Sequence, residues 1–266
     1  MFSEIAEYYR TEALPHIWCP GCGIGTITGA FTRAVKTLQL DQNKVAVVSG
    51  IGCSSRMPGY LDFNTLHTTH GRALAFATGI KAANPELDVF VIMGDGDATA
   101  IGGNHFIHAA RRNIDLTAIV INNNIYGMTG GQSSPLTPHD KRATTSPYGT
   151  IERPLQLLDL AQAAGATYGA RATAYHNQLL AKLIVDAYRH PGFSVVEAIS
   201  QCPVSYGRRN KFKTPSDMLL WQKEHGVMVG RREIRGEDFS IGEIFKKEAP
   251  EFTREYEKLR QRLREV

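Results

Sequence analysis

The chain has 266 residues, of which 42% are hydrophobic and 21% are charged, and its formal net charge is +4. This length predicts one large domain or one domain with appendages, able to bury a core without disulfides. The small positive charge does not by itself indicate nucleic-acid binding, and no run of about 18 apolar residues predicts a membrane span. The N-terminus lacks the pattern of a signal peptide, so we expect a cytoplasmic protein.

Apolar periodicity predicts helices that alternate with strands along the chain. After an opening loop, the pattern predicts a helix at 26–38, a strand at 44–50, a helix at 72–83, a strand at 88–93, a helix at 105–112, a strand at 116–121, helices at 154–164 and 175–190, and a strand at 192–199. The strands are apolar throughout, as expected when both faces are covered. We therefore predict a doubly wound α/β fold with a largely parallel sheet, which binds ligands at the carboxyl ends of its strands.

Polar residues follow two of these strands directly. Gly94-Asp95-Gly96-Asp97 comes after the strand at 88–93, and Asn122-Asn123-Asn124 after the strand at 116–121, with a spacing of 28 positions from Asp95 to Asn123. Carboxylate and amide oxygens are ligands that Mg²⁺ prefers, usually shared with phosphates. The glycines let the backbone approach a phosphate closely. Each motif alone is most often a turn, but together they predict a magnesium and diphosphate site.

Four cysteines form a second candidate set. Cys19 and Cys22 form a C-x₂-C pair in a glycine-rich loop, whereas Cys53 and Cys202 each follow a predicted strand. In a cytosolic protein such cysteines favour metal binding over disulfides. The residues alone leave a [4Fe–4S] cluster, a structural zinc ion and unrelated thiols open.

The order of these motifs resembles the β-subunits of the 2-oxoacid:ferredoxin oxidoreductases. The resemblance rests on the runs at 18–23, 50–54, 67–73, 94–97, 122–132 and 202–203, and covers about residues 10 to 225. Segments 202–211 and 221–225 look most like the 2-oxoglutarate branch of that family. The resemblance implies a thiamine-diphosphate-binding fold with Mg²⁺ and one [4Fe–4S] cluster.

The resemblance also implies roles for individual residues. Asp95 and Asn123 would bind Mg²⁺ through their side chains and Ile125 through its backbone carbonyl, and the cluster would bind Cys19, Cys22, Cys53 and Cys202. The residues implied to contact the cofactor are Ile51, Gly52, Cys53, Ser54, His70, Gly94, Gly96, Asp97, Gly127 and Met128. No catalytic residue is assigned, because in this family the glutamate that activates the pyrimidine ring comes from the partner subunit.

The implied activity is the reversible oxidative decarboxylation of 2-oxoglutarate to succinyl-CoA and CO₂, with coenzyme A as co-substrate and ferredoxin as electron acceptor. The implied partner is an α subunit, in an (αβ)₂ assembly without nucleic acid or membrane. We expect residues 1–215 to bind thiamine diphosphate and the cluster, and the charged, partly helical residues 216–266 to form an extension that packs on that partner.

Several alternatives remain open. The substrate could be pyruvate or a broad range of 2-oxoacids, and the chain could belong to a thiamine-dependent decarboxylase or synthase without redox function. A zinc-stabilised binding module is the alternative that is not an enzyme. The basic runs at 206–213 and 231–235 predict either a solvated face or a docking surface for an acidic partner.

Overall fold

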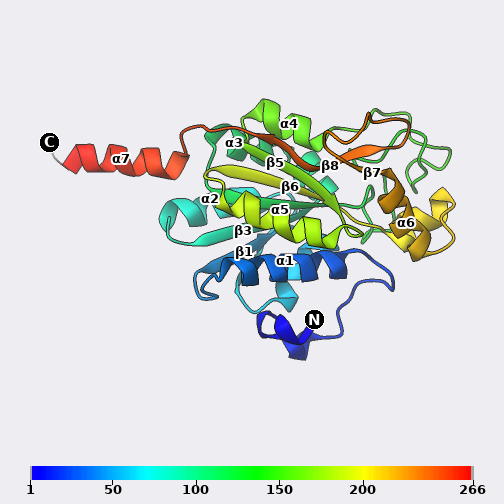
Figure 1. The fold of residues 1–266 in the computed structure, drawn as a ribbon, viewed down its shortest axis with the longest axis horizontal. Helices are drawn as coiled ribbons and strands as arrows, with labels where there is room; N and C mark the ends of the chain where they lie inside the picture. The colour runs from blue at the N-terminus through cyan, green and yellow to red at the C-terminus, as the bar shows by residue number, and fades with distance from the viewer. Residues whose placement is uncertain (1, 265–266) are drawn as a thin grey trace.

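A computed structural model describes residues 2–264, in which one sheet lies between two layers of helices (Figure 1). The strands are β1 (Val45–Ser49), β2 (Asn64–His67), β3 (Asp88–Gly94), β4 (Leu116–Asn122), β5 (Tyr168–Thr173), β6 (Phe193–Ile199), β7 (Gly226–Met228) and β8 (Phe239–Lys246). The helices are α1 (Ile24–Leu38), α2 (Ala73–Ala83), α3 (Gly103–Arg112), α4 (Leu157–Ala164), α5 (Asn177–Arg189), α6 (Pro215–His225) and α7 (Phe252–Arg264). In the described part of the chain, none of the helices is long and apolar enough to cross a bilayer.

The strand order is β2-β1-β3-β4-β6-β5-β8-β7, and the first six strands of this order are parallel. The order turns at β1, because β2 lies on one side of it and β3 on the other. In doubly wound sheets such a switch point opens a crevice at the carboxyl ends of the strands. The predicted α/β fold class is therefore confirmed, and the residues after β1 and β3 lie at this crevice.

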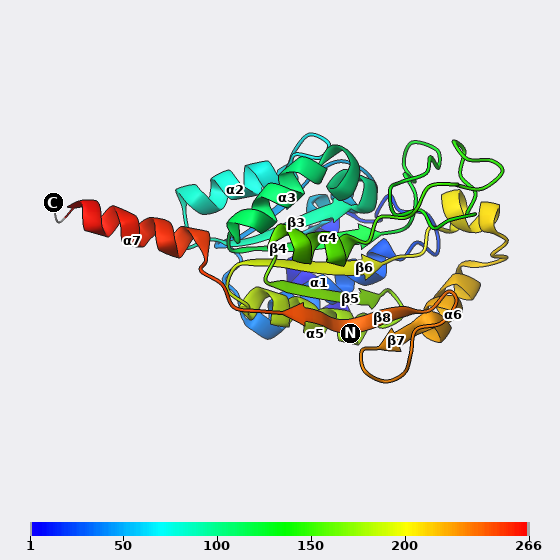
Figure 2. The ribbon, with the colours of Figure 1, turned by 90° about the horizontal axis from the view of Figure 1, so that it is seen from above.

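Two apolar cores cover the two faces of the sheet. Helices α1 and α5 pack on one face, where the ring of Phe31 meets that of Phe90 at 5.1 Å between centroids. Helices α2, α3 and α4 pack on the other face, where Phe106 meets Phe193 at 5.8 Å (Figure 2). Every residue of β4 is buried, which explains its continuous apolar sequence.

The C-terminal part extends the sheet rather than leaving it. Strand β8 pairs antiparallel with β5, and β7 pairs with β8 at the outer edge. Helix α7 then projects away from the body of the molecule (Figure 1). The division of the chain at residue 215 stays a prediction, although Phe239–Lys246 shares the sheet of the first part.

A buried ion pair connects the sheet to the loop after β4. Arg171 of β5 donates from Nε to Oε2 of Glu197 in β6 at 2.7 Å, and Glu197 accepts through Oε1 from Asn122 at 2.8 Å. Their side chains are 15% and 4% exposed, so little water screens the pair. Glu197 thus fixes the residue that precedes Asn123.

We expect Arg171→Ala to lower the free energy of unfolding by about 3 kcal/mol, because it leaves Glu197 buried without its cation. Lys182→Ala is the matched control: its ion pair with Asp186 is on the surface, and removing it costs about 0.5 kcal/mol. Urea unfolding followed by circular dichroism measures both. Equal losses in the two variants would contradict a stabilising role for the buried pair.

Candidate functional site

The ends of three neighbouring strands bring the predicted site residues together. Strand β3 pairs in parallel with both β1 and β4, so Gly50–Ser54, Gly94–Asp97 and Asn122–Asn124 lie at one edge of the sheet. Asp95 and Asn123 are buried there, at 3% and 9% exposure. The structure thus brings the two residues predicted to bind Mg²⁺ to the same edge of the sheet.

Asp95 is a carboxylate with little solvation. Its Oδ2 accepts a hydrogen bond from Ser134 Oγ at 2.5 Å, and its backbone carbonyl accepts one from Thr99 at 2.7 Å. Burial raises the pKa of Asp95 to about 7, against the stabilising effect of the Ser134 hydrogen bond. A divalent cation bound at this carboxylate would compensate for the lost water, so the residue fits a magnesium ligand. Ser134 lies in the long loop, where sequence spacing gave no signal for it.

The loop after β4 is folded by its own amide side chains. Asn122 accepts a hydrogen bond from the backbone N–H of Asn124 at 3.0 Å, and Asn123 accepts one from that of Ile125 at 3.3 Å. Asn124 has a φ of 60°, a left-handed conformation that asparagine tolerates better than most residues. The turn keeps the Asn123 amide beside the end of β3, and Ile125 is buried next to it.

Tyr126 covers the Gly-Asp-Gly turn, a position for which no sequence pattern predicted a role. Its hydroxyl donates to the carbonyl of Gly96 at 3.3 Å, and a side chain at Gly96 would overlap the tyrosine ring. Burial raises the pKa of Tyr126, and the neighbouring Asp95 and Asp97 add to this shift. The Asn-Asn-Asn-Ile-Tyr-Gly run contained the only signal for this residue.

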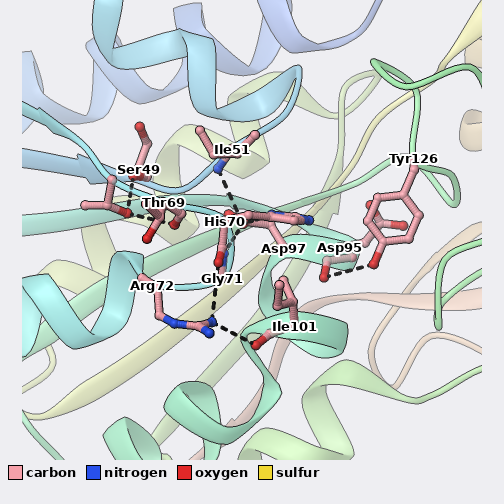
Figure 3. Close-up of polar contacts among 12 residues, drawn as sticks. Ser49, Ile51, Thr69, His70, Gly71, Arg72, Asp95, Asp97, Ile101 and Tyr126 are labelled. Atoms are coloured by element: carbon pink, nitrogen blue, oxygen red, sulfur yellow. Dashed lines mark hydrogen bonds and ion pairs between the residues drawn. The ribbon is translucent and has the colours of Figure 1, made fainter.

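The remaining residues predicted to contact a cofactor lie around this edge and differ in how exposed they are. Ser54 is buried, and its Oγ lies 3.0 Å from where a side chain on Gly94 would begin. Ile51 and Met128 are 39% and 49% exposed, at the open side of the site. His70 and Asp97 contact each other through His70 Nδ1 and Asp97 Oδ1, at 2.5 Å (Figure 3). Gly52 has a φ of 125°, which requires glycine.

The cysteines lie directly behind the same loop. A side chain on Gly127 would begin 3.5 Å from Cys202 Sγ and 3.7 Å from Cys53 Sγ, so both thiols flank this backbone. The other three cysteines lie near enough to Cys22 to help raise the pKa of its thiol, after the larger effect of burial. Cys19 is exposed, whereas the other three are half-buried. The structure therefore brings the predicted set together beside the predicted cofactor loop.

Hydrogen bonds connect the three segments that carry the cysteines to one another and to the loop at Gly127. Trp18 donates from Nε1 to the carbonyl of Cys53 at 2.7 Å, and the N–H of Gly23 donates to Gln201 at 3.2 Å. Ser205 donates to the carbonyl of Gly127 at 3.2 Å. These contacts join segments that lie far apart in the sequence, and they hold the thiols in place before any metal binds.

Three of the four thiols, those of Cys22, Cys53 and Cys202, are partly shielded from water. Burial raises the pKa of Cys22 to about 12 and that of Cys53 to about 11, and it also raises the pKa of Cys202. These three thiols are therefore protonated at neutral pH in the absence of a metal, and a metal must displace their protons on binding. Within residues 2–264, no three histidine, cysteine or acidic side chains are arranged to hold a single metal ion. The cysteine set fits a metal group only through its thiol chemistry and its convergence.

A cavity lies on the other side of the asparagine loop. It has a volume of about 420 Å³ and is lined by Asn122–Asn124, the Arg171–Glu197 pair, Trp221 of α6 and Phe239 at the start of β8, among others. Asp95, Gly96 and the cysteines are not part of its lining. Asn123 therefore borders this cavity, whereas the other residues predicted to bind the cofactor and its metal lie outside its lining.

Comparison with known proteins points to one family. Residues 42–198 match the family described as thiamine pyrophosphate enzymes, C-terminal TPP-binding domain. The 2-oxoglutarate synthase subunit KorB of Archaeoglobus fulgidus is 55% identical, and the match covers 99% of this chain and 97% of that protein. The protein of the same name from Methanocaldococcus jannaschii is 50% identical, with 97% of each chain covered.

A solved structure agrees with these matches. It is described as 2-oxoglutarate:ferredoxin oxidoreductase from Magnetococcus marinus with 2-oxoglutarate, coenzyme A and succinyl-CoA bound. It superposes on this chain with a TM-score of 0.87 at 37% sequence identity, covering 97% of this chain and 90% of that one. The similarity extends over the whole sheet, including the strands after residue 215.

Proposed function

Since this chain belongs to the β-subunits of the 2-oxoacid:ferredoxin oxidoreductases, we propose that it is the thiamine diphosphate-binding subunit of an enzyme that converts 2-oxoglutarate and coenzyme A to succinyl-CoA and CO₂, reversibly and with ferredoxin as electron acceptor. One observation carries the redox part of the proposal. The loop that begins with Asn123 reaches the thiols of Cys53 and Cys202 at Gly127, only four residues later. A cofactor held at Asn123 and a cluster held by these cysteines would be neighbours, as electron transfer requires.

The proposed residue roles follow from the geometry of the edge. Asp95 and Asn123 supply side-chain oxygens for Mg²⁺, and Ile125 supplies its carbonyl. Gly94, Gly96 and Gly127 let the backbone approach the diphosphate, because glycine has no side chain of its own. Ile51, Gly52, Ser54, His70 and Met128 line the open side, where the rest of the cofactor would lie. Asp97 is buried and contacts His70, so it affects the site through the imidazole.

The cofactors supply the bond chemistry. Bound thiamine diphosphate provides the carbon nucleophile and electron sink that decarboxylation of a 2-oxoacid needs, and a [4Fe–4S] cluster accepts single electrons. The chain's own contribution is to orient and shield. Cys19, Cys22, Cys53 and Cys202 bind the cluster, Tyr126 covers the Gly-Asp-Gly turn, and burial of Asp95 excludes water around the metal.

The chain needs a partner to complete the site. The relatives are named as subunits, and the cofactor edge of this chain is open, with Ile51 and Met128 exposed. We propose an α subunit that covers this edge and supplies the glutamate for the pyrimidine ring, in an (αβ)₂ assembly. Tyr256, Leu259 and Leu263 lie exposed along one side of the projecting α7, and they support its packing on the same partner.

The substrate follows from the names of the relatives. Those called 2-oxoglutarate synthase subunits are 50% to 55% identical to this chain, whereas those called 2-oxoacid:ferredoxin oxidoreductases are 39% to 45% identical. This difference favours 2-oxoglutarate over pyruvate or a broad range of 2-oxoacids. A thiamine-dependent decarboxylase or synthase without redox function would leave the convergence of the four thiols unexplained.

We expect Asp95→Ala to abolish Mg²⁺-dependent binding of thiamine diphosphate, because it removes the charged metal ligand at the end of β3. Binding is measured by isothermal titration calorimetry on the complex with its α subunit. Asp159→Ala is the control: it removes an acidic side chain from the first turn of α4, and this variant should bind as the wild type does. Undiminished binding by Asp95→Ala would exclude this metal site and with it the proposed function.

The substrate assignment predicts a higher kcat/KM for 2-oxoglutarate than for pyruvate, by a factor of about 100 or more, since a site that pairs a second carboxylate rejects an analogue lacking it. Coenzyme A-dependent reduction of ferredoxin by the assembled enzyme measures both values. A preference for pyruvate, or equal values, would overturn the assignment to 2-oxoglutarate and leave the thiamine chemistry standing.

A further inference from the structure

One buried carboxylate connects three of the loops at the cofactor edge. Asp97 Oδ1 accepts hydrogen bonds from the backbone N–H of Gly71 at 2.6 Å and of Ile51 at 3.4 Å, and it contacts Nδ1 of His70 at 2.5 Å (Figure 3). The side chain is 1% exposed. The loops after β1, β2 and β3 therefore meet at a single oxygen atom.

These bonds determine which nitrogen of His70 carries the proton. The carboxylate accepts from two backbone N–H groups, and a carboxylate oxygen can only accept hydrogen bonds. The donor in its contact with the imidazole is therefore Nδ1–H of His70. Nε2 is then the atom that His70 presents to a ligand. The ring lies edge-on to that of Tyr126, with 6.1 Å between centroids, and extends toward the side where Tyr126 and Asp95 lie (Figure 3).

The carboxylate is confined so that it cannot reach the open edge itself. A side chain at Gly50 would overlap its oxygens, and one at Gly102 would overlap the backbone carbonyl of Asp97. Oδ2 is buried without a hydrogen-bond partner in the described part of the chain. An unsatisfied buried oxygen is unfavourable, and such groups persist where they have a function.

We propose that Asp97 is a positioning residue that acts through His70: it fixes the imidazole so that Nε2 faces thiamine diphosphate. The proposal rests on the proposed function, in which this edge binds the cofactor. It differs from the role implied by the family resemblance, in which Asp97 contacts the cofactor directly.

A double-mutant cycle separates this role from a merely structural one. If Asp97 acts through His70, its removal has no further effect once the imidazole is gone, whereas independent effects multiply. The variants are Asp97→Ala, His70→Ala and the double variant, each in the complex with the α subunit. The measured quantity is the Kd of thiamine diphosphate at saturating Mg²⁺, by isothermal titration calorimetry, which does not depend on turnover.

We expect each single substitution to weaken binding by roughly 10-fold, the usual effect of removing an outer partner of a bound group, and the double variant to bind within about 2-fold of His70→Ala. Asp97→Asn keeps an acceptor oxygen of the same shape and should restore most of the affinity lost in Asp97→Ala. It also serves if the alanine variant fails to fold. Asp88→Asn, at the other end of β3 where the carboxylate accepts from Tyr188, is the matched control and should bind as the wild type does.

Three results would overturn the inference. A double variant weakened by about 100-fold would mean that the two residues act independently. Wild-type affinity in Asp97→Ala would mean that the carboxylate positions nothing, and a loss in Asp97→Asn as large as in Asp97→Ala would mean that its charge acts, not its geometry. A wild-type complex that binds no thiamine diphosphate would overturn the proposed function together with this inference.

Discussion

Parallel pairing of β1, β3 and β4 is the constraint on which the site depends. It forces the carboxyl ends of three strands to one edge, so residues that are 28 positions apart in the sequence, such as Asp95 and Asn123, become neighbours. The order of the strands turns at β1, which opens the same edge to a ligand. Helices on both faces keep the strands dry and leave the edge as the place where polar groups can function.

Two buried carboxylates, those of Asp95 and Asp97, lie at this edge. Asp95 and Asp97 are both withdrawn from water, yet their surroundings differ: Asp95 accepts from the Ser134 hydroxyl and from the backbone of its own turn, whereas Asp97 accepts from the backbone of two other loops and contacts an imidazole. The first is thereby suited to a cation and the second to holding other groups in place. Gly127 connects this edge to the thiols of Cys53 and Cys202, so the two predicted sites form one continuous structure.

Much of this arrangement could be predicted from the sequence, because β3, β4 and β6 are continuous apolar runs and their ends carry unusual polar residues. Strand β2 was missed because it is an exposed edge strand with the polar sequence Asn-Thr-Leu-His, and β5 because Gly169, Ala170 and Ala172 are poor strand formers. Strand β8 lies in a charged segment that favoured a helix. Ser134 and the link from Asp97 to His70 depend on loop contacts that no local pattern encodes.

The central claim is that the four cysteines hold a redox cluster beside a thiamine site. The most direct test is the iron and zinc content of the complex, purified without oxygen, together with its visible spectrum. The account predicts a brown protein, bleached by dithionite, with about four irons per copy of this chain after subtracting any in the partner. A colourless protein with about one zinc per chain would mean that the cysteines are structural, and it would contradict the oxidoreductase function while leaving the thiamine site intact.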